Sequence, residues 1–231
     1  MRWRATFILL PVVLLAGGYA VLFESEPSTD EANPTFKQVH QLVDSVRDAS
    51  YPQLKDAEIT MHDLRSNVVY FETRFTFSSY FFARRLRYLM MFNREAMNRR
   101  IPADGLRAIV AHELAHIDYF HRERRIGLLG LVRLLSPSFT ARLERKADLE
   151  AIALGYGQGL QLFRRWLYGN IPPDRVAEKK RDYFSPEEIE AILQAEKQHP
   201  EIMRTFARCI PGNLAEIERE TRKPAAACPV D

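Results

Sequence analysis

Hydrophobic and polar positions divide the chain into an apolar run near its start and a long region of mixed periodicity. The run covers residues 5–23, and its 19 residues would extend about 28 Å as a helix, close to the roughly 30 Å of a bilayer's hydrocarbon core. Arg2 and Arg4 precede the run and acidic residues follow it, which predicts a cytoplasmic N-terminus and a domain across the membrane. A cleaved signal peptide ending near Gly18 and Ala20 is the alternative, but the length of the run favours an uncleaved anchor.

The region that follows predicts both helices and strands. Residues 36–46 carry apolar side chains at helical spacing. Residues 67–77 alternate instead, with phenylalanines on one face and polar residues on the other, and a second apolar strand is expected at 87–93. Helical spacing returns after Pro102 and again over residues 141–151. These elements predict an α+β fold, in which a helix packs on a small, mostly antiparallel sheet and the C-terminal part is helical.

The pattern also divides the chain into four parts. Residues 1–23 form the single transmembrane helix or signal peptide, and the polar, proline-containing residues 24–35 are a linker. Residues 36–220 are long enough for one domain with its own core. Residues 221–231 form a tail rich in proline and alanine.

Charge argues against nucleic acid as a partner. The chain has 33 lysines and arginines and 30 acidic residues, which gives a net charge of +3. Without Arg2 and Arg4, residues 24–231 carry only +1. A domain that binds nucleic acid usually has a much larger positive excess, gathered on one face.

The most specific chemical pattern is His112-Glu113-x-x-His116. On a helix with about 100° per residue, the histidines lie about 40° apart, and Glu113 is about 60° from His116 on the same side. Two imidazoles one turn apart suit Zn²⁺, and the glutamate can act on a water beside the metal. A buried helix with two unpartnered histidines would be unstable unless something satisfied them. The pattern therefore predicts a metal site that holds one zinc ion per chain.

A catalytic zinc usually takes three protein ligands, so a third donor is expected further along the chain. His121 lies five residues after His116 and points about 140° away from it on a continuous helix. Glu144 and Asp148 are one turn apart and share a face of the second predicted helix, whereas Glu150 lies about 120° from Glu144. We expect Glu144 as the third ligand and Asp148 as the carboxylate that orients a ligand histidine.

The order His-Glu-x-x-His, then Glu144-x-x-Ala-Asp148, resembles the gluzincin metallopeptidases, and most closely the family that includes HtpX and the CAAX prenyl proteases. Residues 88–117 are similar to that family's strand, short connector and active-site helix, and the resemblance covers roughly residues 56–155. The resemblance implies a zincin-like fold. It implies His112, His116 and Glu144 as zinc ligands, Glu113 as the catalytic base and Asp148 as the support of a ligand histidine.

The chain departs from the family in its C-terminal part. The family commonly has a His-Pro pair followed by an arginine at the sixth position, whereas here Arg204 stands at the fifth position after His199. A capping-box pattern that starts at Ser185 predicts a helix running towards His199. His199 is therefore a candidate for stabilising the oxyanion of the reaction, together with Tyr156 and Tyr168.

These features predict a zinc-dependent endopeptidase that hydrolyses protein or peptide substrates. Residues 5–23 would anchor it in the bacterial inner membrane with the catalytic domain facing the periplasm, or release it as a soluble periplasmic protein after signal cleavage. The alternative class is a membrane-anchored scaffold or adaptor that binds zinc without catalysis. Glu113 favours the enzyme, because a structural zinc site needs no base.

The two cysteines, Cys209 and Cys228, fit neither a metal-binding spacing nor a redox pair. In an oxidising compartment they would form a disulfide that closes a loop of about 20 residues and stabilises the fold by roughly 3 kcal/mol. Two free thiols are the alternative.

Overall fold

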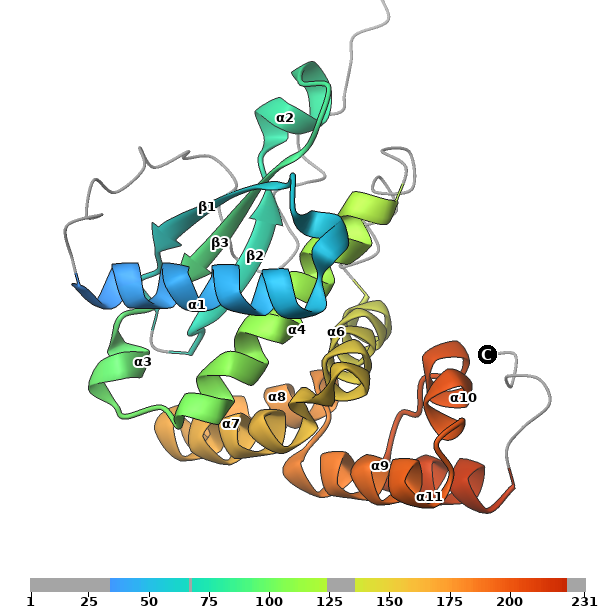
Figure 1. Ribbon diagram of the computed structural model, residues 1–231. Helices are drawn as coiled ribbons and strands as arrows, with labels where there is room; N and C mark the ends of the chain where they lie inside the picture. Colours follow the sequence, from blue (N-terminus) through green and yellow to red (C-terminus); the bar gives the residue numbers. More distant parts are fainter. Residues whose placement is uncertain (1–33, 67, 124–135, 224–231) are drawn as a thin grey trace, which may run out of the picture.

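The long helix α4 (Ala103–Arg122) connects the two ends of the molecule. The computed structural model describes residues 34–66, 68–123 and 136–223. A three-stranded sheet and α1 (Pro34–Ser50) lie at one end of α4, and the C-terminal helices gather at the other (Figure 1). The α+β class predicted from the pattern is therefore confirmed.

The sheet contains β1 (Glu58–Asp63), β2 (Phe71–Phe75) and β3 (Arg87–Phe92) in the order β1-β3-β2. β2 and β3 are antiparallel, but β1 and β3 are parallel, so the prediction of a mostly antiparallel sheet is wrong for one of its two pairs. The chain crosses from β1 to the far edge, forms β2 and returns between them as β3. The pattern did not indicate β1, because only two apolar residues, Ile59 and Met61, alternate with polar ones and Met61 alone is buried.

The predicted strand at 67–77 ends early. β2 stops at Phe75, and the chain turns into α2 (Phe77–Phe82). The side chain of Thr76 accepts a hydrogen bond from the backbone N–H of Ser79, which caps the new helix. The segment between the strands is therefore a helical tip at the end of a β hairpin, and α3 (Glu95–Asn98) follows the return strand β3.

Helix α1 confirms the helical pattern of residues 36–46. It buries one apolar face against the core, formed by Phe36, Val39, Val43 and Val46. A short 3-10 turn (Pro52–Leu54) follows it, and the hydroxyl of Tyr51 donates a hydrogen bond to the carbonyl of Ala111 at 2.8 Å. This bond ties the N-terminal helix to α4 one residue before the first motif histidine.

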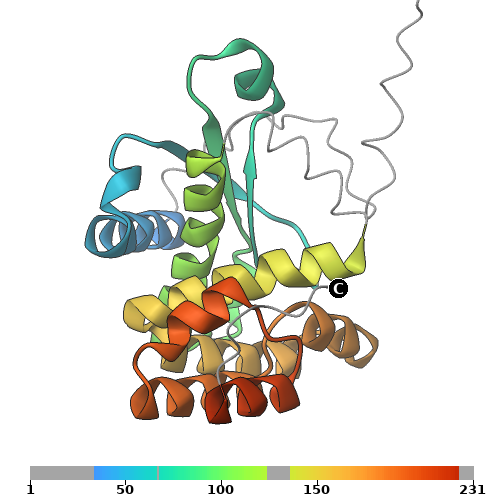
Figure 2. The same ribbon diagram turned by 90° about the vertical axis from the view of Figure 1, so that its right-hand side faces the viewer.

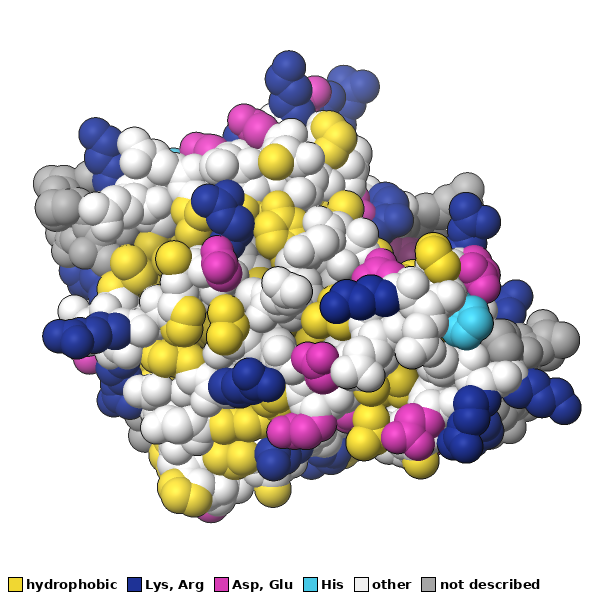
Figure 3. Space-filling view, turned by 60° about the horizontal axis from the view of Figure 1, so that its bottom comes forward, with side chains coloured by type: hydrophobic (Ala, Val, Ile, Leu, Met, Phe, Trp, Pro, Cys, Tyr) yellow, Lys and Arg dark blue, Asp and Glu magenta, His cyan; other side chains and the backbone are white. Residues whose placement is uncertain are grey.

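The C-terminal part is helical, as predicted. It comprises α6 (Pro137–Ala151), a π-helical turn (Ile152–Tyr156), α7 (Gly157–Asn170), α8 (Pro173–Asp182), α9 (Pro186–Gln198), α10 (Ile202–Arg208) and α11 (Leu214–Arg222). Figure 2 shows α6 lying across α4, above the remaining C-terminal helices. On the face that Figure 3 brings forward, hydrophobic side chains are interrupted by charged ones.

Close packing fixes the crossing of α4 and α7. At Gly159 the carbonyl of Asp104 occupies the space that a side chain would need, so only glycine permits this approach. The crossing brings α7 close enough for its later residues to reach α6, and one of these, Arg164, is described below.

Two of the described helices extend across predicted boundaries between parts of the chain. α1 begins at Pro34, inside the predicted linker, and α11 continues to Arg222, past the predicted domain end at residue 220. None of the described helices is both long enough and apolar enough to cross a bilayer. The predicted anchor at residues 5–23 lies outside the described residues.

Candidate metal centre

Helix α4 carries both motif histidines on its buried side. Pro102 is its N-cap, at the helix start that the sequence predicts. His112 and His116 are only 1% and 7% exposed, because the apolar residues around them pack into the core. Two imidazoles buried to this extent require polar partners.

The structure provides a shared partner from α6. The Oε2 atom of Glu144 lies 3.2 Å from Nε2 of His112 and 3.1 Å from Nε2 of His116. The two Nε2 atoms are 3.2 Å apart. Three donor atoms from two helices therefore meet at one point, and His112, His116 and Glu144 form the one group among the described residues that could hold a metal ion.

The donor set fits a tetrahedral metal such as zinc. Ligand bonds of about 2.0–2.1 Å in a tetrahedron separate the ligand atoms by about 3.3 Å, close to the separations observed. Since Nδ1 of His112 faces Asp148, a neutral ring carries its proton there and turns the lone pair of Nε2 towards Glu144. Converging lone pairs and a carboxylate are stabilised only by a cation between them, either a metal ion or a proton.

Asp148 supports this group from behind. Its Oδ1 atom lies 2.8 Å from Nδ1 of His112 and accepts a hydrogen bond from Arg164 at 2.7 Å, while Oδ2 accepts one from the backbone N–H of Phe184 at 3.1 Å. The contact with His112 lies off the direction of the ring N–H, so the attraction between the ring proton and Asp148 is electrostatic and not a linear hydrogen bond. Asp148 is fully buried, and these three contacts fix both its position and the tilt of the imidazole.

The pKa values follow from the same contacts. Burial lowers the pKa of His112, but Asp148 and Glu144 outweigh it and raise the pKa to about 9. Burial raises the pKa of Glu144, yet the two histidines hold it well below its usual value. Burial also raises that of Asp148, but Arg164 and His112 hold it below its usual value. Both carboxyl groups are therefore ionised near neutral pH.

Glu113 behaves differently. It is 5% exposed and lies outside the group of three converging donors. Burial raises the pKa of its carboxyl, and the opposing effect of His112 and His116 does not cancel that shift. A carboxyl group whose pKa is moved towards neutrality is better matched to accept and return a proton.

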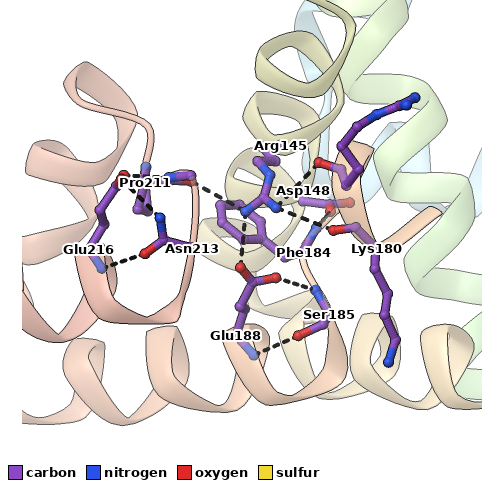
Figure 4. A network of polar contacts seen from close by, with 11 residues as sticks. Arg145, Asp148, Lys180, Phe184, Ser185, Glu188, Pro211, Asn213 and Glu216 are labelled. Carbon is purple, nitrogen blue, oxygen red and sulfur yellow. Dashed lines mark hydrogen bonds and ion pairs between the residues drawn. The ribbon is translucent and has the colours of Figure 1, made fainter. Parts of the chain in front are cut away.

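Arg145 anchors the other side of α6. It follows Glu144 in the sequence, is 5% exposed, and points towards Phe184 and Glu188 (Figure 4). Its guanidinium lies 4.7 Å above the ring of Phe184. It donates hydrogen bonds of 3.3–3.4 Å to the carboxylate of Glu188 and to the carbonyls of Lys180, Arg181 and Pro211.

These bonds hold the connector between α8 and α9 against α6. The predicted capping box is confirmed, because Ser185 and Glu188 exchange side-chain and backbone hydrogen bonds at the start of α9 (Figure 4). With Phe184 bonded to Asp148 and Glu188 bonded to Arg145, the connector is fixed at two points. The residue that precedes Phe184 is thereby directed towards the metal group.

That residue is Tyr183, which the sequence did not identify. The centroid of its ring lies 5.9 Å from that of the His112 ring. The guanidinium of Arg164, a residue of α7, lies 4.2 Å from the Tyr183 centroid. Burial, and then the charge of Glu144, raise the pKa of Tyr183 well above 10, so its hydroxyl remains a donor. No spacing in the sequence links Tyr183 to the motif, because its position depends on the connector folding back onto α6.

The other candidate residues lie elsewhere. His121 is at the exposed end of α4, outside the group, as predicted. His199 is the C-cap of α9, half exposed, and its ring lies 4.0 Å from Glu201. The hydroxyl of Tyr156 is hydrogen-bonded to Ser50 at 2.7 Å. The proposed role of His199 in catalysis stays a prediction.

Cys209 follows α10, and the described part of the chain contains no free cysteine. Its predicted partner, Cys228, lies outside the described residues, so the pairing stays a prediction. Comparisons of the chain with protein-family models, with curated proteins and with solved structures find no match.

Proposed function

We propose that the protein is a zinc-dependent endopeptidase. The observation that carries this proposal is the convergence of His112, His116 and Glu144 beside a buried glutamate, Glu113, whose pKa is raised. The resemblance of these residues to the gluzincin motifs favours zinc and peptide-bond hydrolysis over other metals and reactions. The described residues offer three converging donors, and a catalytic site needs three protein ligands while a closed structural site needs four.

Each residue has a separate role in this proposal. When bound, zinc supplies an acidified water and polarises the scissile carbonyl. Glu113 accepts a proton as water attacks the carbonyl carbon and passes it to the leaving amine, which its raised pKa favours. Asp148 holds the ring of His112 in place throughout.

Tyr183 is the proposed donor to the oxyanion. Its ring lies beside that of His112, and the charges of Glu144 and Glu113 both raise the pKa of its hydroxyl, which supports this role. A protonated phenol can donate a hydrogen bond to the oxygen on which negative charge develops. Arg164 packs on its ring and also bonds Asp148, so one side chain supports both the donor and the metal group.

The sheet suggests how a peptide would bind. β2 is an edge strand that packs against α4, and Thr73 of β2 is among the groups that act on the Glu113 carboxyl. An extended substrate could add to this edge, with its main chain paired and its side chains alternating between two faces. If residues 5–23 span the inner membrane as predicted, the substrates are periplasmic or membrane-associated proteins.

The test is to measure zinc content and proteolysis together in the purified full chain. Glu113→Gln should retain one zinc ion per chain and lose roughly 10²–10⁴-fold in turnover of casein or a peptide library, because it removes the base and no ligand. Glu123→Gln, at the exposed end of the same helix, is the matched control and should change neither quantity.

Two results would contradict the assignment. A Glu113→Gln variant with normal turnover excludes Glu113 as the base. Stoichiometric zinc in a wild-type protein that cleaves no peptide bond in the casein or peptide library supports the alternative, a membrane-anchored scaffold.

A further inference from the structure

The helical tip of the β hairpin exposes two adjacent aromatic rings. Phe81 is 52% exposed and Phe82 is 87% exposed, and α2 stands beyond the end of the sheet at the top of Figure 1. The other large hydrophobic side chains that are exposed in the described part of the chain are three leucines that are not adjacent in the sequence, at positions 154, 162 and 214. On the face in Figure 3, hydrophobic side chains are likewise interrupted by charges. We call Phe81 and Phe82 the aromatic tip.

An arginine cluster follows the aromatic tip directly. Arg84, Arg85 and Arg87 are all exposed and line an open hollow of about 440 Å³. Glu58, which is opposite Arg87 in the parallel pairing of β1 and β3, is the one carboxylate among the described residues that line it. The hollow therefore carries a net positive charge next to exposed apolar surface.

A series of ring contacts connects the aromatic tip with the metal group. Phe81 contacts Tyr80, which stacks on Phe75 at 5.7 Å, and Phe75 contacts Phe120 at 5.4 Å. The ring of Phe120 lies 6.4 Å from that of His116. The tip is therefore supported by packed aromatic side chains that extend to the candidate metal centre, so it has a fixed position relative to that centre.

We propose that the aromatic tip and the arginine cluster dock on an anionic phospholipid surface. Phenylalanine rings partition into the boundary between headgroups and acyl chains, and arginines beside them bind lipid phosphates. The adjacency of the aromatic tip and the arginine cluster favours a membrane, which binds both. A soluble anion would bind the arginines but would make no contact with the phenylalanine rings. This docking is independent of the proposed peptidase activity, and it would hold the metal centre at a fixed height above the bilayer.

The test places a fluorescent reporter at the tip. Because residues 5–23 would themselves bind vesicles, the readout has to be local, so Phe82→Trp is compared with Leu214→Trp in the full chain. The signal of the native tryptophans is subtracted using the parent protein. In vesicles of phosphatidylcholine and phosphatidylglycerol with brominated acyl chains, we expect blue-shifted and at least twofold quenched emission from position 82 and unchanged emission from position 214.

The charge component has its own variant. Replacing Arg84, Arg85 and Arg87 with glutamine in the Phe82→Trp protein should reduce partition of the tip by about fivefold per arginine and abolish most of the quenching. Vesicles of phosphatidylcholine alone should give the same loss. Circular dichroism should be unchanged, because all of these positions are exposed.

Several results would overturn the proposal. Quenching at position 82 no greater than at position 214 excludes insertion. A blue shift without vesicles that grows with protein concentration identifies a second copy of the chain as the partner. Release of the tip by millimolar inorganic phosphate shows that the hollow binds a soluble anion instead.

Discussion

Helices α4 and α6 form two polar clusters, and these differ in the source of their positive charge. In the metal group, His112 and His116 face Glu144, and none of the described lysines or arginines forms an ion pair with that carboxylate. In the second cluster, Arg122 pairs with Asp118 one turn earlier on α4 and with Glu150 of α6 at 3.3 Å. Both clusters combine two residues one turn apart on α4 with an acid on α6.

The pKa values of the two α6 acids are shifted in opposite directions. Burial and the nearby charge of Asp118 raise the pKa of Glu150. Glu144 has a lowered pKa and remains an anion between two imidazoles. The comparison teaches that the surroundings of each α6 acid set the direction of its pKa shift, because Glu144 faces two imidazoles whereas Glu150 lies beside a second carboxylate, Asp118.

The largest effect on zinc affinity should come from replacing one of the two α6 acids, Glu144, with alanine. Glu144→Ala removes one of three donors, so we expect zinc affinity to fall by more than the roughly 10–100-fold typical of supporting residues. Glu150→Ala, the control, should leave zinc content unchanged. Zinc titration with a competing chelator measures both. If Glu150→Ala loses zinc and Glu144→Ala retains it, the ion is bound by the second cluster and the assignment of the metal group is wrong.

A second prediction concerns turnover rather than metal. Tyr183→Phe should retain zinc and reduce kcat by roughly 10²–10³-fold, because one donor to the oxyanion is lost while the ring stays packed under Arg164. Tyr156→Phe removes a hydroxyl that is bonded to Ser50 and should leave kcat unchanged. Steady-state kinetics on one peptide measure kcat for both variants. Equal losses of kcat would contradict the assignment of Tyr183 as the donor to the oxyanion.

Asp148→Asn should have an intermediate effect. The variant keeps the shape of the side chain but loses the charge that acts on His112 and Arg164, so zinc affinity should fall by roughly 10–100-fold. Asp182→Asn changes another buried aspartate, which is paired with Arg181, and is the control. Unchanged zinc affinity in Asp148→Asn would show that the contact with His112 has no influence on the metal.

The smallest effect is expected in the second cluster. Arg122→Gln breaks the ion pairs with Asp118 and Glu150, but the arginine is 59% exposed and Gln53 still donates a hydrogen bond to Asp118. We expect the free energy of unfolding to fall by about 1 kcal/mol or less and zinc content to stay constant. Denaturant unfolding followed by metal analysis checks both, and loss of zinc would contradict the separation of the clusters.

The sequence predicted the residues whose positions follow from helical geometry. His112, His116, Glu144 and Asp148 are each one turn from a partner on the same helix, so their shared faces follow from periodicity. The structure confirms the grouping of the first three. Periodicity also predicted α1 and α4, and the motif of residues 185–188 predicted the capping box of α9.

What the sequence did not predict depends on contacts between distant segments. Tyr183 and Arg164 reach the metal group from the α8–α9 connector and from α7, through tertiary packing that leaves no local pattern. β1 was missed because its pairing with β3 is parallel and joins strands that are separated by β2 and α2. The helical turn at α2 overrode an alternating pattern through one side-chain cap, Thr76.

The adjacent residues Glu144 and Arg145 lie on different faces of α6, about 100° apart on a regular helix. Glu144 contacts the imidazoles, and Arg145 donates to four oxygen acceptors, which lie at the end of α8, at the start of α9 and in the α10–α11 segment. Rotation of α6 about its own axis would break both sets of contacts at once. These contacts hold the three donor atoms together without an ion, so the site is preorganised. We therefore expect that a chelator removes zinc reversibly and that the protein rebinds zinc without refolding.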